Sequence, residues 1–116
     1  MTLPFSTYRR AGNLVFLSGD VGFDKNGELV AGGLAAETTQ TLANIDTKLQ
    51  DLGLGLADVV SLTCYVTDIT DKATMDGAYL EAFQGLPLPT RTTIEVSALP
   101  AGLSLEITAV AFDTGR

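Results

Sequence analysis

Histidine is absent from this chain of 116 residues, and cysteine occurs once, as Cys64. Because histidine is the usual general base near neutral pH, its absence excludes Ser-His-Asp and Cys-His nucleophile systems and most catalytic zinc sites. A lone cysteine forms no internal disulfide, which favours a reducing compartment. Any chemistry must therefore use guanidinium, carboxylate and hydroxyl groups, the backbone and water.

Positive charge is scarce as well. Seven lysines and arginines stand against 14 aspartates and glutamates, so the net charge is −7. Arg9 and Arg10 are the only adjacent basic pair, and two charges do not form the basic stripe that neutralises phosphates. We therefore expect no nucleic-acid partner. An anionic small molecule would have to be captured at short range by a local cation.

Long hydrophobic runs are also missing. No segment approaches the length of a membrane-spanning helix, and the first residues do not resemble a signal peptide. The sequence therefore predicts a soluble, cytoplasmic protein without a membrane partner. Hydrophobic residues make up 46 % of the chain, enough for one core, so residues 1–116 are interpreted as a single domain. This size is marginal, and assembly into an oligomer would bury more surface.

The hydrophobic pattern predicts two helices and five strands. Leu42, Ile45 and Leu49 recur at spacings of three and four on one helix face, and Gly53 follows as a left-handed cap. In chain order we expect strands over 5–9 and 13–18 joined at Ala11-Gly12, a helix over 34–52, a strand over 59–67, a helix over about 71–83, and strands over 91–96 and 104–112. This order predicts an α+β fold, a mixed sheet with both helices on one face.

The face of the sheet without helices is predicted to be rich in hydroxyl groups. If the alternation of the strands aligns, it carries Ser61, Thr63, Tyr65, Thr67, Arg91, Thr93, Glu95, Glu106 and Thr108. A sheet face exposed to water usually carries more charge than this set does. We therefore expect this face to pack against other subunits.

Arg91 is the leading candidate for a binding residue. Its guanidinium offers the planar fork that grips a carboxylate through two parallel hydrogen bonds. Such a charge-assisted bond contributes about 1.5–3 kcal/mol. The alternative is an arginine at a strand edge that points into water or pairs with Glu95.

Three further positions are candidates for a site. Glu106 interrupts an otherwise uncharged strand and would activate a water molecule if burial raised its pKa, although a salt bridge or a surface position is the alternative. Gly19 lets the backbone approach a ligand closely, and the hydroxyl and amide of Ser18 are able to donate to a carboxylate. A Ser-Gly pair after a strand is also an ordinary turn. Cys64 is expected to be a packed core thiol.

Several stretches of the chain resemble one known family in order and spacing. They are residues 11–19, 58–60, 65–68 and 89–96, followed by Leu99-Pro100 and Leu105-Glu106-Ile107. Together they cover nearly the whole chain. The sequence resembles the Rid family, the reactive intermediate deaminases, which are also called YjgF-like proteins.

This resemblance implies a chorismate-mutase-like fold and a homotrimer whose sheets face inward. It further implies three clefts between subunits, each built from two chains. Family members with the arginine hydrolyse imines that arise from reactive enamines such as 2-aminoacrylate, releasing a 2-keto acid and ammonium. No metal or organic cofactor is implied, and the partner would be a small imino or keto acid.

The resemblance also assigns roles to residues. Arg91 would bind the substrate carboxylate, Ser18 and Gly19 would lie beside it, and Glu106 would orient the attacking water. By the same likeness Phe5 and Asp76 would line the cleft.

The chain departs from the family pattern at a few positions. Phe5 stands where a tyrosine is frequent, and Asp20 and Asp76 stand where amides are frequent. An added carboxylate near the cleft would repel an anionic substrate or favour one with a positive amine. The loop before Pro89 is also shorter. Two alternatives to the deaminase therefore remain, a protein that binds a small carboxylate without turnover and a deaminase of a larger substrate such as 2-aminomuconate.

Overall fold

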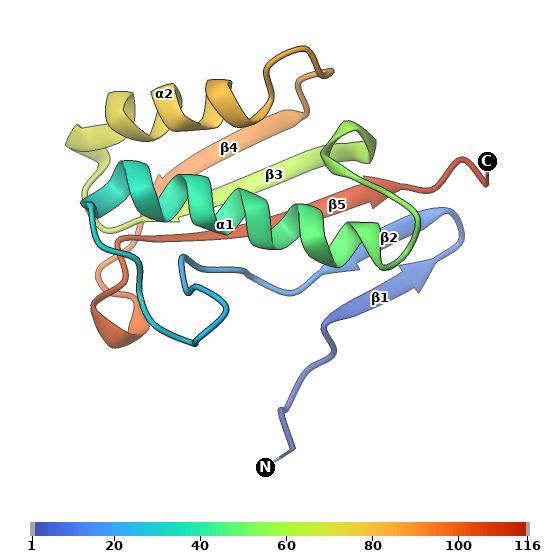
Figure 1. The fold of residues 1–116 in the computed structure, drawn as a ribbon, viewed down its shortest axis with the longest axis horizontal. Helices are drawn as coiled ribbons and strands as arrows, with labels where there is room; N and C mark the ends of the chain where they lie inside the picture. Colours follow the sequence, from blue (N-terminus) through green and yellow to red (C-terminus); the bar gives the residue numbers. More distant parts are fainter. Residues whose placement is uncertain (1, 116) are drawn as a thin grey trace.

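A single mixed sheet forms the centre of the molecule, and both helices cover the same face of it (Figure 1). The computed structural model describes residues 2–115. Within them the strands are β1 (Tyr8–Ala11), β2 (Leu14–Leu17), β3 (Val59–Val66), β4 (Thr90–Glu95) and β5 (Leu105–Phe112). They lie in the order β1-β2-β5-β3-β4, with β3 and β4 parallel and the other pairs antiparallel. The predicted α+β fold is confirmed.

The helices form where the hydrophobic spacing predicts them. Helix α1 spans Gly33–Gln50, and Leu42, Ile45 and Leu49 are fully buried on its inner face. Gly53 ends it in the left-handed conformation (φ +76°), which lets Leu54 N–H donate to Leu49 O at 2.9 Å. Helix α2 spans Lys72–Ala82 and follows a single 3₁₀ turn over Ile69–Asp71.

The first hairpin is shifted relative to its prediction. The expected strand over residues 5–9 begins only at Tyr8, and the turn consists of Gly12 and Asn13 rather than Ala11 and Gly12. Gly12 has a φ of +60°, a conformation that glycine adopts without strain. The residues before Tyr8 therefore run outside the sheet, which matters because Phe5 is among them.

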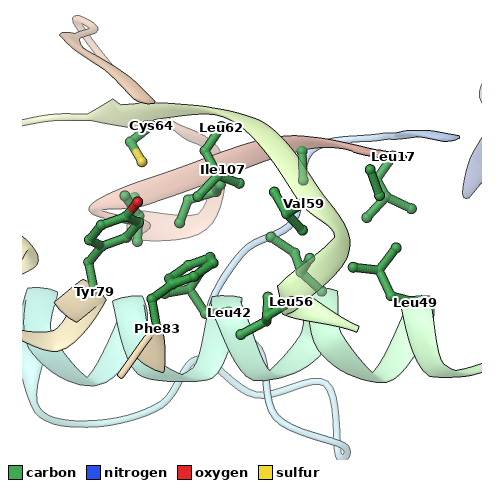
Figure 2. Close-up of a cluster of buried hydrophobic side chains, with 14 of the residues drawn as sticks. Leu17, Leu42, Leu49, Leu56, Val59, Leu62, Cys64, Tyr79, Phe83 and Ile107 are labelled. Atoms are coloured by element: carbon green, nitrogen blue, oxygen red, sulfur yellow. The ribbon is translucent and has the colours of Figure 1, made fainter. Parts of the chain in front are cut away.

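The core lies between the helices and the sheet. Strand β5 sends Leu105, Ile107, Ala109 and Ala111 into it, and none of these is more than 2 % exposed. Figure 2 shows Leu42 of α1 and Phe83, the residue after α2, packed beneath Leu62 and Ile107 of the sheet. Alternation along β5 then directs Glu106 and Thr108 to the open face, as predicted.

The register between β3 and β4 shows that three residues of β4 lie on the other face of the sheet from the one expected. Leu62 pairs with Arg91, Cys64 with Thr93 and Val66 with Glu95. Paired residues of adjacent strands point to the same side, so Arg91, Thr93 and Glu95 lie on the helix side and not with Ser61, Thr63 and Tyr65. The physical reason is that alternation relates residues within one strand, whereas a shift of one residue in pairing inverts a whole strand.

The open face is still poor in charge after this correction. Among the strand residues that point to it, only Arg9 and Glu106 are charged. Phe16, Ile94 and Phe112 lie on it and are 44 %, 43 % and 40 % exposed. No helix of residues 2–115 covers this apolar and hydroxylated surface. In the same part of the chain no helix is long and apolar enough to cross a membrane.

Candidate functional site

Arg91 is held by helix α2 rather than by water or by Glu95. Its Nη2 donates to Asp76 Oδ1 at 2.6 Å, and its side chain is only 17 % exposed. Lys72, one turn before Asp76 on α2, donates from Nζ to the other carboxylate oxygen at 2.8 Å. Glu95 is engaged elsewhere, because its Oε1 accepts from Ile69 N–H at 3.0 Å. Both ordinary alternatives for Arg91 are therefore wrong.

The Tyr79 ring provides a flat support for the guanidinium. Arg91 Cζ lies 4.6 Å from the centroid of this ring, a cation–π contact. Tyr79 is itself packed against Phe83 with ring centroids 4.9 Å apart, so its position is set by the core. Burial raises the pKa of Tyr79, and the charge of Arg91 opposes this. The ring covers one face of the guanidinium, and a ligand must approach in the plane of the N–H groups.

Asp76 is ionised at neutral pH. Partial burial acts to raise the pKa of its carboxyl, but the hydrogen bonds and charges of Lys72 and Arg91 together outweigh burial and lower it. Asp76 Oδ1 is the only hydrogen-bond acceptor of the Arg91 guanidinium among residues 2–115, and a guanidinium carries five N–H donors. Arg91 therefore keeps donors for a ligand although Asp76 holds it in place.

Cys64 lies beneath this cluster and is inert. Its side chain is buried at the same end of the core as Tyr79 (Figure 2). Burial raises the pKa of the thiol to about 11, against the influence of Arg91, which lowers it. The buried Oγ1 of the neighbouring Thr93 has no hydrogen-bond partner among residues 2–115. The expected core thiol is confirmed.

A second group of predicted residues lines a hollow at the other side of the sheet. Phe5, Ser18, Gly19, Pro100 and Glu106 surround a space of about 430 Å³. They come from the N-terminal segment, the end of β2, the turn before β5 and the start of β5. The structure therefore brings together Phe5, the Ser-Gly pair and Glu106, as the resemblance implies.

Gly19 and Glu106 are in direct contact within this hollow. A Cβ at Gly19 would lie 2.4 Å from Glu106 Oε2 and 2.9 Å from the carboxyl carbon. Only glycine fits at this position while Glu106 keeps its place. The Glu106 carboxylate forms no hydrogen bond or ion pair with residues 2–115, so it is available to a water molecule or a ligand.

Ser18 does not have the free donors that the sequence suggests. Its Oγ donates to Ser6 O at 2.6 Å, and its backbone N–H donates to Thr7 O at 3.1 Å. Both bonds attach the N-terminal segment, and with it Phe5, to the rim of the hollow. The backbone N–H of Gly19 makes no hydrogen bond within residues 2–115 and is the donor that remains.

Asp20 is directed away from the hollow. Its carboxylate accepts from Lys48 Nζ of α1 at 2.6 Å and is 9 % exposed. Its backbone exchanges hydrogen bonds of 2.8 and 2.9 Å with Ile107, the residue after Glu106. The expectation that Asp20 adds charge to the cleft is therefore wrong. Asp20 anchors the β2 end to β5 beside Glu106.

The two groups lie on opposite faces of the same sheet. Arg91 and Asp76 are on the helix side at the edge strand β4, whereas Glu106 is on the open side of β5, with β3 between these strands. One chain therefore does not bring Arg91 and Glu106 to a common ligand. Sequence reasoning also missed Lys72 and Tyr79, which the spacing of α2 places on the same helix face as Asp76. Among residues 2–115 no cluster of three histidine, cysteine or acidic side chains is arranged to hold a metal ion.

Comparison with known proteins identifies the family. The family model described as Endoribonuclease L-PSP matches residues 1–113. The chain belongs to the Rid, or YjgF-like, family. This Rid protein is 40 % identical over 110 residues to a RutC family protein of Pyrococcus horikoshii, covering 94 % of this chain and 86 % of the relative. It is 37 % identical over 109 residues to the 2-iminobutanoate/2-iminopropanoate deaminase of Mus musculus, covering 93 % and 80 %.

Solved structures of the family share the fold. The Rid protein YyfA of Yersinia pestis superposes with a TM-score of 0.90 at 31 % identity, over 97 % of this chain and 90 % of that one. TdcF of E. coli, solved with bound serine, has a TM-score of 0.90 at 28 % identity, over 98 % and 91 %. This Rid protein therefore has the fold of its family.

Proposed function

We propose that this Rid protein is an imine deaminase that hydrolyses 2-imino acids, such as the imine derived from 2-aminoacrylate, to 2-keto acids and ammonium. The observation that carries the proposal is the guanidinium of Arg91, which is fixed by Asp76 and Tyr79 yet keeps N–H donors for a carboxylate. The deaminase names of mammalian relatives at 36–40 % identity support it.

The chemistry needs only groups that the chain supplies. Arg91 holds the substrate carboxylate, and Glu106 accepts a proton from a water molecule as the water oxygen bonds to the imine carbon. Glu106 passes this proton to the imine nitrogen, which gives the carbinolamine, and then carries the proton of the carbinolamine hydroxyl to the same nitrogen. The C–N bond breaks and ammonia leaves as the C=O bond forms, and ammonia takes up a proton from water to become ammonium. An imine carbon is already electrophilic, so positioning and proton transfer are sufficient and no cofactor takes part.

The complete site forms between two chains. Arg91 and Glu106 face opposite sides of one sheet, so they act on one ligand only if different subunits supply them. The uncovered apolar and hydroxylated face supports association through the sheets, in a homotrimer with three equivalent clefts. In each cleft one chain contributes Phe5, Gly19 and Glu106, and its neighbour contributes Arg91 and Asp76. A cytoplasmic location is part of the proposal, and the single cysteine, which suits a reducing compartment, supports it.

Kinetics with a freshly generated imine tests the proposal. Keto-acid formation from 2-aminoacrylate is followed with semicarbazide trapping to separate enzymic from spontaneous hydrolysis. Arg91→Ala is expected to lower kcat/KM at least about tenfold, since it removes a charge-assisted contact. Lys25→Ala removes a cation from an exposed turn and serves as the control. Equal rates for wild type and Arg91→Ala would refute the function.

A second candidate is a protein that binds a small carboxylate without turnover. Two observations favour it, namely the engagement of both Ser18 donors and the lack of a hydroxyl at Phe5. TdcF with bound serine supports an amino acid as the ligand. Saturable binding of serine or pyruvate in calorimetry, together with no acceleration of imine hydrolysis, would decide for this candidate.

A further inference from the structure

Asp76 occupies the position that a ligand of Arg91 must approach. Its Oδ1 lies 2.6 Å from Arg91 Nη2, and Tyr79 covers one face of the guanidinium. A carboxylate bound to the remaining donors therefore lies in the guanidinium plane, next to a second carboxylate. Asp76 is 31 % exposed on its side chain, so a small ligand is able to touch it. A ligand at this site therefore interacts both with the positive charge of Arg91 and with the negative charge of Asp76.

Lys72 keeps this arrangement fixed. Each oxygen of Asp76 accepts one hydrogen bond, Oδ1 from Arg91 and Oδ2 from Lys72, and each has a second lone pair for another donor. The bond from Lys72 opposes rotation of the carboxylate away from Arg91. The three side chains carry a net charge of +1, the sum of two cations and one anion. One ligand carboxylate neutralises the cluster, and any further acceptor atom meets the lone pairs of Asp76.

We infer that Asp76 makes the Arg91 site selective for carboxylates that carry an N–H group on the adjacent carbon. The inference rests on the proposed function and names the substrate form that the site prefers. A 2-imino acid in its protonated form, or the enamine from which it arises, donates N–H to Asp76 while its carboxylate binds Arg91. A 2-keto acid places an oxygen acceptor at the same point and is repelled. Asp76 thus distinguishes the substrate from its own hydrolysis product.

Binding of stable three-carbon acids tests this selectivity. The probes are L-alanine, which has N–H donors beside the carboxylate, pyruvate, which has an acceptor there, and propionate, which has neither. Titration calorimetry on the wild-type protein is expected to show alanine binding about tenfold more tightly than pyruvate, with propionate between them. In Asp76→Asn the ratio of alanine to pyruvate affinity is expected to fall at least about fivefold, mainly because pyruvate binds more tightly.

Two control variants separate selectivity from other effects. Lys72→Met removes a charge next to Asp76 but retains the carboxylate, so the alanine preference is expected to persist. Asp76→Asn makes the cluster more positive and Lys72→Met makes it less positive, so an effect of net charge alone would weaken the alanine preference in the first variant and strengthen it in the second. A gain of preference in Lys72→Met as large as the loss in Asp76→Asn would therefore overturn the inference. An unchanged ratio in Asp76→Asn, or no detectable binding of alanine to the wild type, would overturn it too.

Arg91→Ala tests the proposed function separately. This variant is expected to lose binding of alanine, pyruvate and propionate alike. If all three still bind, the proposed anchoring role of Arg91 fails. If all three are lost while Asp76→Asn leaves the preference intact, Arg91 remains the anchor and only the selectivity assigned to Asp76 is wrong. Inhibition of turnover by added pyruvate is a second measurement, expected to strengthen about fivefold in Asp76→Asn.

Discussion

The carboxylate of Glu106 lies against the backbone of Gly19 so closely that no side chain fits between them. A Cβ on Gly19 would come within 2.4 Å of Glu106 Oε2. Gly19 follows β2, which ends at Leu17, and Glu106 is the second residue of β5, so this contact joins the exit of one strand to the start of the other at the hollow that also holds Phe5. The Glu106 carboxylate is able to occupy this position only because Gly19 has no Cβ.

The first prediction concerns this contact. Gly19→Ala is expected to push the Glu106 side chain out of the hollow, because that side chain is partly exposed and is able to rotate. Imine hydrolysis should fall about tenfold or more, whereas the free energy of unfolding should change by no more than about 1 kcal/mol. Steady-state kinetics and urea unfolding measure the two effects.

Gly77→Ala provides the matched control for that prediction. Gly77 lies within α2, and nothing lies within 4 Å of the place where its Cβ would be. This variant should gain about 0.5–1 kcal/mol of stability, because alanine loses less backbone entropy than glycine in a helix. Unaltered turnover in Gly19→Ala would show that the position of Glu106 does not matter for the reaction.

Tyr79 is predicted to support ligand binding through Arg91. Tyr79→Leu removes the ring that lies 4.6 Å from the guanidinium, and a cation–π contact of this kind contributes about 0.5–2 kcal/mol. KM for the imine should rise roughly two- to tenfold, and the protein should lose stability because Tyr79 is buried. Tyr79→Phe keeps the ring and should behave as the wild type in KM. A similar KM for Phe and Leu variants would contradict the role of the ring.

Asp76 is predicted to contribute stability that is lost in acid. The pKa of its carboxyl is lower in the folded state than the ordinary value of about 3.9, so folding is favoured by ionisation. The contribution is fully present above the unfolded pKa and disappears as pH falls through the folded pKa. Because Asp76 is 31 % exposed, it should amount to about 1 kcal/mol or less.

The measurement is the difference in urea unfolding free energy between wild type and Asp76→Asn from pH 7 to pH 3. The difference should be constant above about pH 5 and shrink below about pH 4. A difference that grows towards low pH would contradict the assignment.

Cys64 is predicted to destabilise the protein at alkaline pH. Burial raises the pKa of the thiol to about 11 in the folded state, above its ordinary value of 9.0, so the folded protein holds this proton more tightly. Stability is therefore complete below the unfolded pKa and falls as pH rises through the folded pKa, by up to about 2–3 kcal/mol. The pKa of Tyr79 is raised as well, so the free energy of unfolding is measured against pH for the wild type and for Cys64→Val. The difference between the two curves is the contribution of the thiol.

Thiol labelling checks the same burial. At pH 8 the folded protein should react with a disulfide reagent only on unfolding, because the Cys64 side chain is both buried and protonated. Rapid labelling of the native protein would show that the core opens at this end.

Much of the fold follows from local patterns in the sequence. The stripe of Leu42, Ile45 and Leu49 predicts α1, and Gly53 marks its end, because helical spacing and a left-handed cap are properties of neighbouring residues. The alternation in β5 predicts that Glu106 points away from the core. The motifs of the chain also indicated the family, which the family model matching residues 1–113 confirms.

The tertiary structure alone decided which side of the sheet Arg91 occupies and which atoms each candidate residue contacts. Arg91 faces α2 because β4 pairs with β3 in one particular register, and no pattern within β4 reveals that register. The hydrogen bond from Arg91 to Asp76 and the hydrogen bond from Ser18 to the N-terminal segment likewise join residues that are distant in the sequence. A sequence specifies such contacts only through the packing of the whole chain. Residue types therefore indicated the chemistry of Arg91 and Glu106, whereas the pairing of the strands placed the two side chains on opposite faces of the sheet.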